Sequence, residues 1–190
     1  MFTDARMETI LDAAYVCFTR HGVRRTTMDD IARAAGMSRP AVYQHVRNKQ
    51  DAFHRLVQRM LDDALDASRR ALEGDEAPAA RIHGVLRPKL EMVMRIWRDS
   101  PAHAAELLAV DARVSSDLLA HYDETMRTLL RGALEQSGLG PGSARTADLL
   151  LALTRGLETD PTDPEAALDL LGRGVDLMIA GLTAGRETTP

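Results

Sequence analysis

The chain contains 190 residues, of which 45% are hydrophobic, 27% charged and 4% aromatic. This balance is typical of a globular protein, and it excludes collagen-like and intrinsically disordered chains. The longest apolar runs, such as residues 149–153, fall far short of the ~18 residues of a membrane-spanning helix. No basic stretch leads into an apolar one near residue 1, so neither a secretion signal nor a membrane partner is expected. A single cysteine, Cys17, allows no internal disulfide and favours the reducing cytoplasm.

Charge is distributed unevenly along the chain, although its total is only −4. Residues 1–50 hold eight basic and five acidic side chains, a net charge of +3. The remaining residues hold 16 basic and 23 acidic side chains, a net charge of −7. A basic end on an otherwise acidic chain indicates that this end meets a polyanion such as nucleic acid.

Helical periodicity dominates throughout, and no stretch alternates in the manner of a strand, so we expect an all-α fold of about nine helices. Capping residues, glycines and prolines place the ends of these helices. The first five predicted helices cover residues 4–21, 27–35, 39–45, 49–73 and 82–97. A sixth begins near residue 101, a seventh covers residues 119–134, and the last two begin at residues 143 and 164. Pro88 lies inside the fifth helix, where its missing N–H predicts a kink or break.

Residues 27–46 have the layout of a helix-turn-helix, because two short predicted helices flank the turn Ala35–Gly36–Met37. The second helix of such a unit reads the major groove of DNA. On a helical wheel Val42 and Val46 point to one side, and two short helices cannot leave both valines exposed. The opposite side carries small, polar and basic side chains. The sequence therefore predicts a DNA-reading surface on the second helix.

The residues predicted to contact DNA fall into two groups. Gln44 suits an adenine edge, Arg39 a base or a phosphate, and Ala41 a thymine methyl. Hydroxyls, helix starts and a lysine around them suit phosphates. Thr27, Ser38 and Asn48 would, however, serve as good helix caps in any protein. The full predicted set is Thr27, Ser38, Arg39, Pro40, Ala41, Tyr43, Gln44, His45, Arg47 and Lys49.

A second candidate site lies in the later helices, where adaptable methionines and aromatic residues suit the wall of an apolar ligand cavity. The predicted lining is Met92, Met94, Trp97, His103, Tyr122 and Met126. The same stripe would equally form plain core. The six histidines form no metal-binding pair and no phosphate loop is present, so no metal, cofactor or catalytic residue is expected.

Residues 26–49 resemble the DNA-binding region of TetR-family transcriptional regulators, and the resemblance covers roughly residues 5–62. It rests on the order of a threonine, Ile31–Ala32, Ala35–Gly36, a serine, Tyr43 and Asn48–Lys49. Val46 departs from the family, which usually has phenylalanine there. The resemblance implies an N-terminal three-helix DNA-binding domain over residues 1–48. It also implies a helical bundle for ligand binding and dimerisation over residues 49–190.

The resemblance also implies a function. It implies a ligand-responsive regulator, most simply a repressor, that binds a palindromic DNA operator as a homodimer and is released by a small, largely apolar effector. The last two helices of such a protein form a four-helix bundle with those of a partner. The implied interface residues are Leu150, Leu153, Leu157, Leu168, Leu171, Val175, Met178 and Ile179. Two alternatives stay open: a helical small-molecule-binding protein without specific DNA readout, and an enzyme housed in the helical body.

Overall fold

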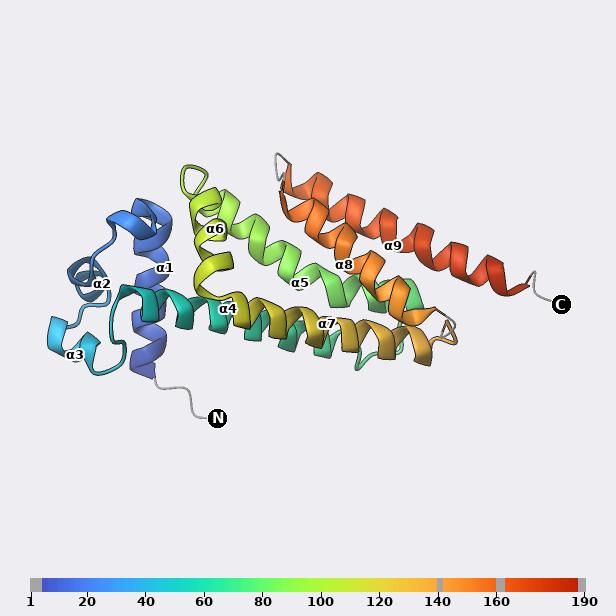
Figure 1. Cartoon of the computed structure of the whole chain (residues 1–190), viewed down its shortest axis with the longest axis horizontal. Helices are drawn as coiled ribbons and strands as arrows, with labels where there is room; N and C mark the ends of the chain where they lie inside the picture. The colour runs from blue at the N-terminus through green and yellow to red at the C-terminus, as the bar shows by residue number, and fades with distance from the viewer. Residues whose placement is uncertain (1–4, 140–141, 160–162, 188–190) are drawn as a thin grey trace. The chain divides into compact units, whose positions relative to one another are not determined.

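The computed structural model describes residues 5–139, 142–159 and 163–187, and over these residues it is entirely helical (Figure 1). The helices are α1 (Ala5–Arg25), α2 (Met28–Ala34), α3 (Arg39–Tyr43), α4 (Lys49–Arg70), α5 (Pro78–Asp99), α6 (Ala104–Val114), α7 (Ser116–Gln136), α8 (Ser143–Thr159) and α9 (Pro164–Glu187). The predicted all-α class is confirmed. Among the described helices, none has the length and apolar character needed to cross a bilayer.

The helices pack into two compact units, and α4, α5 and α7 each contribute to both. The first unit contains the described residues up to Leu61 together with Ile96–Leu119. The second contains Asp62–Arg95 and the described residues from Ala120 onward. The first unit therefore holds the helix-turn-helix together with α6, whereas the predicted domain border at residue 48 stays a prediction.

Helix α1 changes direction at Gly22, which was predicted to end it. The φ of 75° and ψ of 160° at this residue interrupt the helix, which then resumes as far as Arg25. Glycine adopts this left-handed φ without the steric cost of a Cβ atom. The buried hydroxyl of Thr26 holds the bend, because it donates in a shared hydrogen bond to the carbonyl oxygens of Gly22 at 2.8 Å and Cys17 at 3.1 Å.

Side-chain caps begin the next three helices, as the sequence predicted. The Thr27 hydroxyl accepts the N–H of Asp30 at 3.2 Å, and the Asp30 carboxylate accepts the Thr27 N–H at 3.0 Å and its hydroxyl at 2.7 Å. These bonds from Thr27 lower the pKa of Asp30. Ser38 and Asn48 each accept the N–H three residues further on, at 3.4 and 2.8 Å. Gly36, with a φ of 64°, forms the turn between α2 and α3.

Aromatic and ionic contacts fix α1 against the first half of α4. The rings of Phe18 and Phe53 meet edge to face, with centroids 5.4 Å apart and planes 77° apart. Such pairs are favourable because the positive edge of one ring meets the negative face of the other. Arg59 of α4 adds ion pairs to Glu8 at 2.7 Å and Asp12 at 2.9 Å. The start of α4 thus forms one body with the helix-turn-helix.

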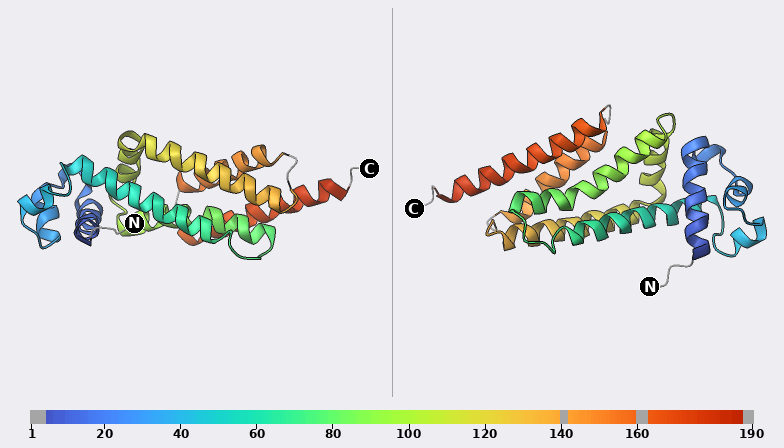
Figure 2. Two further views of the ribbon diagram at one scale, coloured as in Figure 1. Left: turned by 90° about the horizontal axis from the view of Figure 1, so that it is seen from below. Right: turned by 180° about the vertical axis from the view of Figure 1, so that it is seen from behind.

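In the second unit, α8 and α9 run side by side in opposite directions (Figures 1 and 2). Gly174 allows this packing, because a Cβ atom there would lie 2.5 Å from a methyl carbon of Leu153. Glycines in a helix interior are costly unless they permit close approach to another helix. For Gly174 that helix belongs to the same chain.

Helix α5 is continuous through Pro88, so the expected break does not occur. Proline removes the hydrogen bond to the carbonyl of Gly84 and costs about 3 kcal/mol in a helix interior. The adjoining turns bury Val85, Leu86 and Leu90 completely or almost so. Burial of three such side chains, at roughly 1.5–3 kcal/mol each, outweighs the local cost.

Several predicted helix ends also move by a few residues, and two of them have a visible cause. Helix α4 stops at Arg70 instead of continuing to residue 73, because the N–H groups of Leu72 and Glu73 bond to carbonyls only three residues back. Helix α6 begins at Ala104, after a turn in which the Ser100 carbonyl accepts the N–H groups of His103 and Ala104. Both differences arise in single turns, where helical and turn hydrogen bonds compete closely.

We expect the substitution Thr26→Val to lower the free energy of unfolding by about 1 kcal/mol, because it removes the buried hydroxyl that holds the α1 bend while keeping the side-chain volume. Urea unfolding followed by circular dichroism measures this loss. The matched control is Thr9→Val, since Thr9 is exposed on the same helix and donates only to the carbonyl of Ala5. Equal losses in the two variants would contradict the role given to Thr26.

Candidate nucleic-acid interface

Helix α3 and the residues after it, as far as Arg47, have one buried and one exposed side, as the helical wheel predicted, although α3 itself ends at Tyr43 and not at the predicted residue 45. Val42 and Val46 are 0% and 1% exposed. The opposite side is open to solvent, and its exposed residues are Arg39, Pro40, Tyr43, Gln44 and Arg47. Ala41 and His45 are half-buried at its edges. The chain therefore presents a row of polar and basic groups, of the kinds that pair with base edges, on a rigidly anchored helix.

Arg39 is held in place by two neighbours. Its Nη1 atom lies 3.2 Å from a carboxylate oxygen of Asp29, and its Nη2 donates to the Tyr43 hydroxyl at 3.4 Å. The guanidinium also stands 5.5 Å from the centroid of the Tyr43 ring. The hydrogen bond to Tyr43 and the charge of Asp29 raise the pKa of Arg39. The cation is thus oriented before any ligand arrives, and Asp29 competes with a ligand for it.

Lys49 is engaged within the chain. Its Nζ atom donates to the carbonyl oxygen of Arg24 at 2.9 Å, at the C-terminal end of α1. A cation at a helix C-terminus is favourable, since that end carries partial negative charge. Lys49 therefore ties the start of α4 to the end of α1. Its predicted phosphate contact stays a prediction.

Arg47 and Asp51 form a junction between the recognition helix and α4. The Asp51 carboxylate accepts the Arg47 backbone N–H at 2.8 Å and the Arg55 side chain at 3.3 Å. Burial raises the pKa of Asp51, but the Arg47 N–H and the Arg55 charge together lower it by more. The pKa of Asp51 therefore lies below its usual value. Asp51 therefore stays ionised and fixes the segment after α3. The Arg47 side chain, although 85% exposed, also reaches this carboxylate with its Nη2 atom at 3.5 Å.

Other cations of the first unit are exposed and loosely paired. The side chains of Arg24 and Arg33 are 86% and 80% exposed, and their partners are Glu106 and Asp30 at 3.8 and 3.4 Å. Exposed pairs of this kind contribute only about 0–1 kcal/mol. A polyphosphate can therefore replace these carboxylates at little energetic cost.

The six residues predicted to line an apolar cavity divide between the two units. Met92 and Met94 lie in the second unit, whereas Trp97 lies in the first. His103 also belongs to the first unit, where its ring lies against the α1 bend: a Cβ atom on Gly22 would be 3.3 Å from its Nδ1. Three of the six, Met92, Met94 and Trp97, lie on α5, whereas His103, Tyr122 and Met126 follow later in the chain.

Tyr122 and Met126 do line a cavity, among α5, α7 and α8. Beside them Lys89 pairs with Glu158 at 2.8 Å, with side chains only 13% and 16% exposed, and its Nζ stands 5.6 Å from the Tyr122 ring centroid. The Tyr122 hydroxyl is buried and makes no hydrogen bond within the described residues. Burial raises the pKa of Tyr122. Sequence reasoning missed Lys89 and Glu158, because nothing local relates two residues so far apart in the chain.

Comparison with known proteins identifies the helix-turn-helix. Residues 10–56 match a family model described as bacterial regulatory proteins, tetR family. The match includes all of α2 and α3 and parts of α1 and α4. It therefore coincides with the surface described above.

A curated relative extends the similarity further along the chain. The HTH-type transcriptional repressor KstR2 of Rhodococcus jostii is 26% identical over 147 residues, which cover 74% of this chain and 69% of KstR2. Several other relatives are matched over only 22–32% of their own length. The similarity to these proteins is therefore limited to a part of their length.

Solved structures share the whole fold. A transcriptional regulator from Rhodococcus sp. Rha1 is similar with a TM-score of 0.73 at 25% identity, over 92% of this chain and 96% of that chain. SmeT in its complex with triclosan is similar with a TM-score of 0.67 at 24% identity, over 94% and 91% of the two chains. The helical arrangement is thus common to proteins of low overall identity.

We expect the substitution Asp29→Asn to raise affinity for DNA of arbitrary sequence several-fold, because it releases Arg39 and removes one negative charge beside it. Fluorescence anisotropy with a random-sequence duplex measures the change. The control is Asp12→Asn, which removes the same charge from α1, where Asp12 pairs with Arg59. An equal gain in both variants would mean that net charge alone is responsible and that Asp29 does not restrain Arg39.

Proposed function

We propose that this chain is a transcriptional regulator of the TetR family, and that it is a ligand-responsive repressor that binds a palindromic operator in double-stranded DNA as a homodimer. The observation that carries the proposal is the exposed polar side of α3, anchored from beneath by Val42 and Val46. The similarity to the repressor KstR2 supports the proposal that this chain represses transcription and does not activate it. A selection of bound fragments from a genomic library tests the proposal and yields the half-site spacing.

The DNA contact proposed for each exposed side chain follows from its chemistry. Gln44 pairs with an adenine edge, Arg39 with a guanine or a phosphate, and Ala41 allows close approach to a thymine methyl. Tyr43 and the N-terminal ends of α2 and α3 hold the phosphate backbone. In a dimer the two recognition helices would lie about one turn of DNA apart, ~34–36 Å.

The surface proposed for dimerisation is the outer side of α8 and α9. Four of the eight interface residues expected from the sequence, Leu150, Leu171, Val175 and Ile179, are at most 7% exposed within the chain itself. These four side chains face inward, so the expected assignment is corrected for them. Leu153, Leu157, Leu168 and Met178 are half-buried.

The outer side of the same helices carries exposed apolar and small residues. Leu149, Leu170 and Leu177 are 60%, 51% and 75% exposed. A Cβ atom on Gly156 or Gly181 would meet nothing within 4 Å, which leaves room for another helix. Exposed leucines and small residues on paired helices favour packing against a second copy. This supports a four-helix bundle formed with the outer rather than the inner side.

Ligand response is proposed as a shift between two shapes of the protein. A small molecule that binds better to the shape unable to grip DNA lowers operator affinity, and ~1–3 kcal/mol of coupling suffices for a useful response. The complex of SmeT with triclosan is a case of a similar fold that holds a small molecule. It supports, by similarity of fold, an effector for this chain.

We expect Arg39→Ala and Gln44→Ala each to relax preference at one base pair of the operator, at about 1–3 kcal/mol for a good bidentate contact. Binding titrations against single-base operator variants measure this. Tyr43→Phe provides the contrast, because loss of a phosphate contact weakens all sequences alike. A uniform loss in Gln44→Ala would show that Gln44 does not read a base.

We expect operator affinity to fall by orders of magnitude between about 50 and 200 mM salt, because several phosphate contacts release condensed counterions. Anisotropy titrations at a series of salt concentrations measure the slope. The slope is expected to change little in Gln44→Ala, since a base contact releases no counterion. A flat response in the unmodified protein would rule out the electrostatic interface.

We expect the substitution Leu177→Glu to give folded monomers, because it places a charge in the centre of the proposed apolar contact. Size-exclusion chromatography with light scattering measures the mass. The control is Ala80→Glu, which adds the same charge at an exposed position of α5. A dimer that persists in Leu177→Glu would place the interface elsewhere.

A further inference from the structure

We propose that Lys49 is a site of covalent regulation, at which an activated acyl donor (an acyl phosphate or an acyl thioester) converts the side-chain amine to an amide and thereby weakens DNA binding. Two observations carry the inference: lysine is rare in this chain, and the amine of Lys49 contacts the end of α1 beside the reading surface. The effect on DNA rests on the function proposed above, whereas the modification itself does not depend on it.

The basic side chains of this protein are almost all arginines. Of its 24 lysines and arginines, only Lys49 and Lys89 are lysines, and residues 1–50 contain a single one. A lysine amine is a target of acetylation, whereas a guanidinium stays protonated at physiological pH. The cations of the reading surface, such as Arg39 and Arg47, therefore keep their charge in the presence of an acyl donor. Lys49 is the residue of this basic segment whose charge a stable amide removes.

The two lysines have different surroundings. In the second unit, Lys89 donates to both carboxylate oxygens of Glu158 at 2.9 and 2.8 Å, and its side chain is only 13% exposed. Acylation of Lys89 would leave a nearly buried carboxylate without its cation, which is strongly unfavourable. Lys49 is half-buried and donates to a neutral acceptor, the carbonyl oxygen of Arg24, at 2.9 Å. A donor therefore reaches Lys49 at the cost of one neutral hydrogen bond.

The chemical step needs no oxidant or reductant. The unprotonated amine of Lys49 attacks the carbonyl carbon of the donor, and a C–N bond forms. The bond from this carbon to the phosphate oxygen or the thioester sulfur breaks, and its electron pair leaves with the phosphate or thiolate. The amine gives up its proton to solvent. The product is a neutral amide, which keeps one N–H donor but has lost the positive charge.

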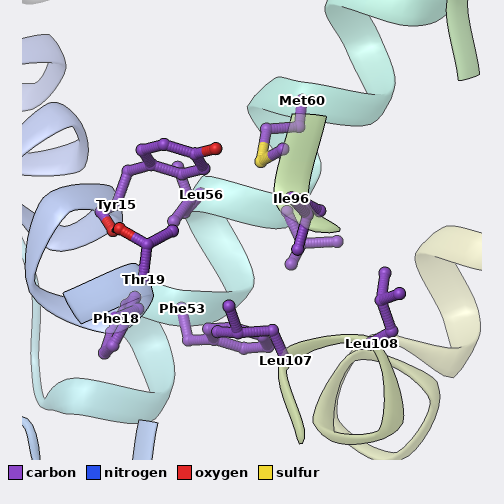
Figure 3. Close-up of a pocket in the computed structure, with 10 residues that line it drawn as sticks. Tyr15, Phe18, Thr19, Phe53, Leu56, Met60, Ile96, Leu107 and Leu108 are labelled. Carbon is purple, nitrogen blue, oxygen red and sulfur yellow. The ribbon is translucent and has the colours of Figure 1, made fainter. Parts of the chain in front are cut away.

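Loss of this charge weakens the tie between α1 and α4. Phe18 of α1 and Phe53 of α4 meet edge to face beside a small apolar pocket and fix the two helices against each other (Figure 3). Lys49 is the first residue of α4, one turn before Phe53, and from there its amine reaches the carbonyl of Arg24. The C-terminal end of a helix carries partial negative charge, which favours an ammonium over a neutral amide.

The same loss acts directly on the attraction to DNA. Acylation lowers the net charge of residues 1–50 from +3 to +2. Attraction to a polyanion falls with each charge removed, and a phosphate contact through Lys49 is lost. Phosphates carry no base information, so the loss is the same for every DNA sequence. In a homodimer it occurs at both half-sites.

The first experiment maps the modification on the full-length folded protein. Acetyl phosphate and acetyl-CoA are added in separate arms, and peptide mass spectrometry follows Lys49 and Lys89. We expect Lys49 to react at least about tenfold faster than Lys89 with at least one donor, because the ion pair to Glu158 protects Lys89. In urea the two rates are expected to become similar. The arm that reacts identifies the donor class. Lys49 reacting no faster than Lys89 in both arms would overturn the site.

The second experiment measures DNA affinity by fluorescence anisotropy with a random-sequence duplex. The full-length protein with Nε-acetyllysine at position 49 is expected to bind about five- to tenfold more weakly, with a salt slope smaller by about one per subunit. Two variants test whether Lys49 carries the effect. Treatment with the reactive donor is expected to change nothing in Lys49→Arg, and to weaken Lys89→Arg as much as the unmodified protein. Thermal melting shows that each variant is folded.

The outcomes separate this inference from the proposed function. An equal loss of affinity on treatment in Lys49→Arg and in the unmodified protein would overturn the role of Lys49. Acetylation of Lys49 without any change in affinity would overturn its effect on DNA binding. Failure of the untreated protein to bind any DNA would overturn the proposed function. The peptide mapping would then still decide whether Lys49 is acylated in preference to Lys89.

Discussion

The burial of Val42 and Val46 is the contact on which the reading surface depends. Helix α3 spans only Arg39–Tyr43, and a helix of this length is not stable alone, because the cost of nucleation is spread over too few hydrogen bonds. Burial of each valine contributes roughly 1.5–3 kcal/mol and determines which side of the helix faces out. The exposed position of Gln44 and Arg39 is thus a consequence of two apolar side chains on the opposite side.

A set of bonds between segments then makes the helix-turn-helix and its neighbours one unit. Thr26 holds the bend at Gly22, Lys49 joins the start of α4 to the end of α1, and Glu106 reaches the same bend from α6. Each of these is a polar contact to a helix terminus or an irregular turn. Such contacts are sensitive to small displacements, because their energy falls steeply with distance and angle.

In the absence of DNA, the arginines of the reading surface pair with carboxylates of the same chain, and phosphates can replace these carboxylates. Carboxylates such as Asp29 and Asp30 neutralise the arginines of the reading surface while no nucleic acid is present. Exposed pairs are weak in water, whereas contact with phosphates also releases counterions from DNA. The exchange therefore favours DNA at low salt, and the carboxylates limit how tightly the surface holds any polyanion.

Structural features that depend only on neighbours within a few residues could be predicted from the amino-acid sequence. Helical periodicity, the caps at Thr27, Ser38 and Asn48, and the turn at Gly36 all follow from bonds that span three or four residues, and the structure has each of them. The inward face of α3 followed from the same spacing. In contrast, the continuity of α5 through Pro88 depends on tertiary packing, which the sequence pattern did not reveal. Tertiary packing also determines that Leu171 and Val175 face inward, because α9 carries apolar or small residues on both sides and periodicity cannot choose between them. The cavities were equally beyond the sequence, since their walls join residues from separate helices, and a void depends on how completely those helices pack.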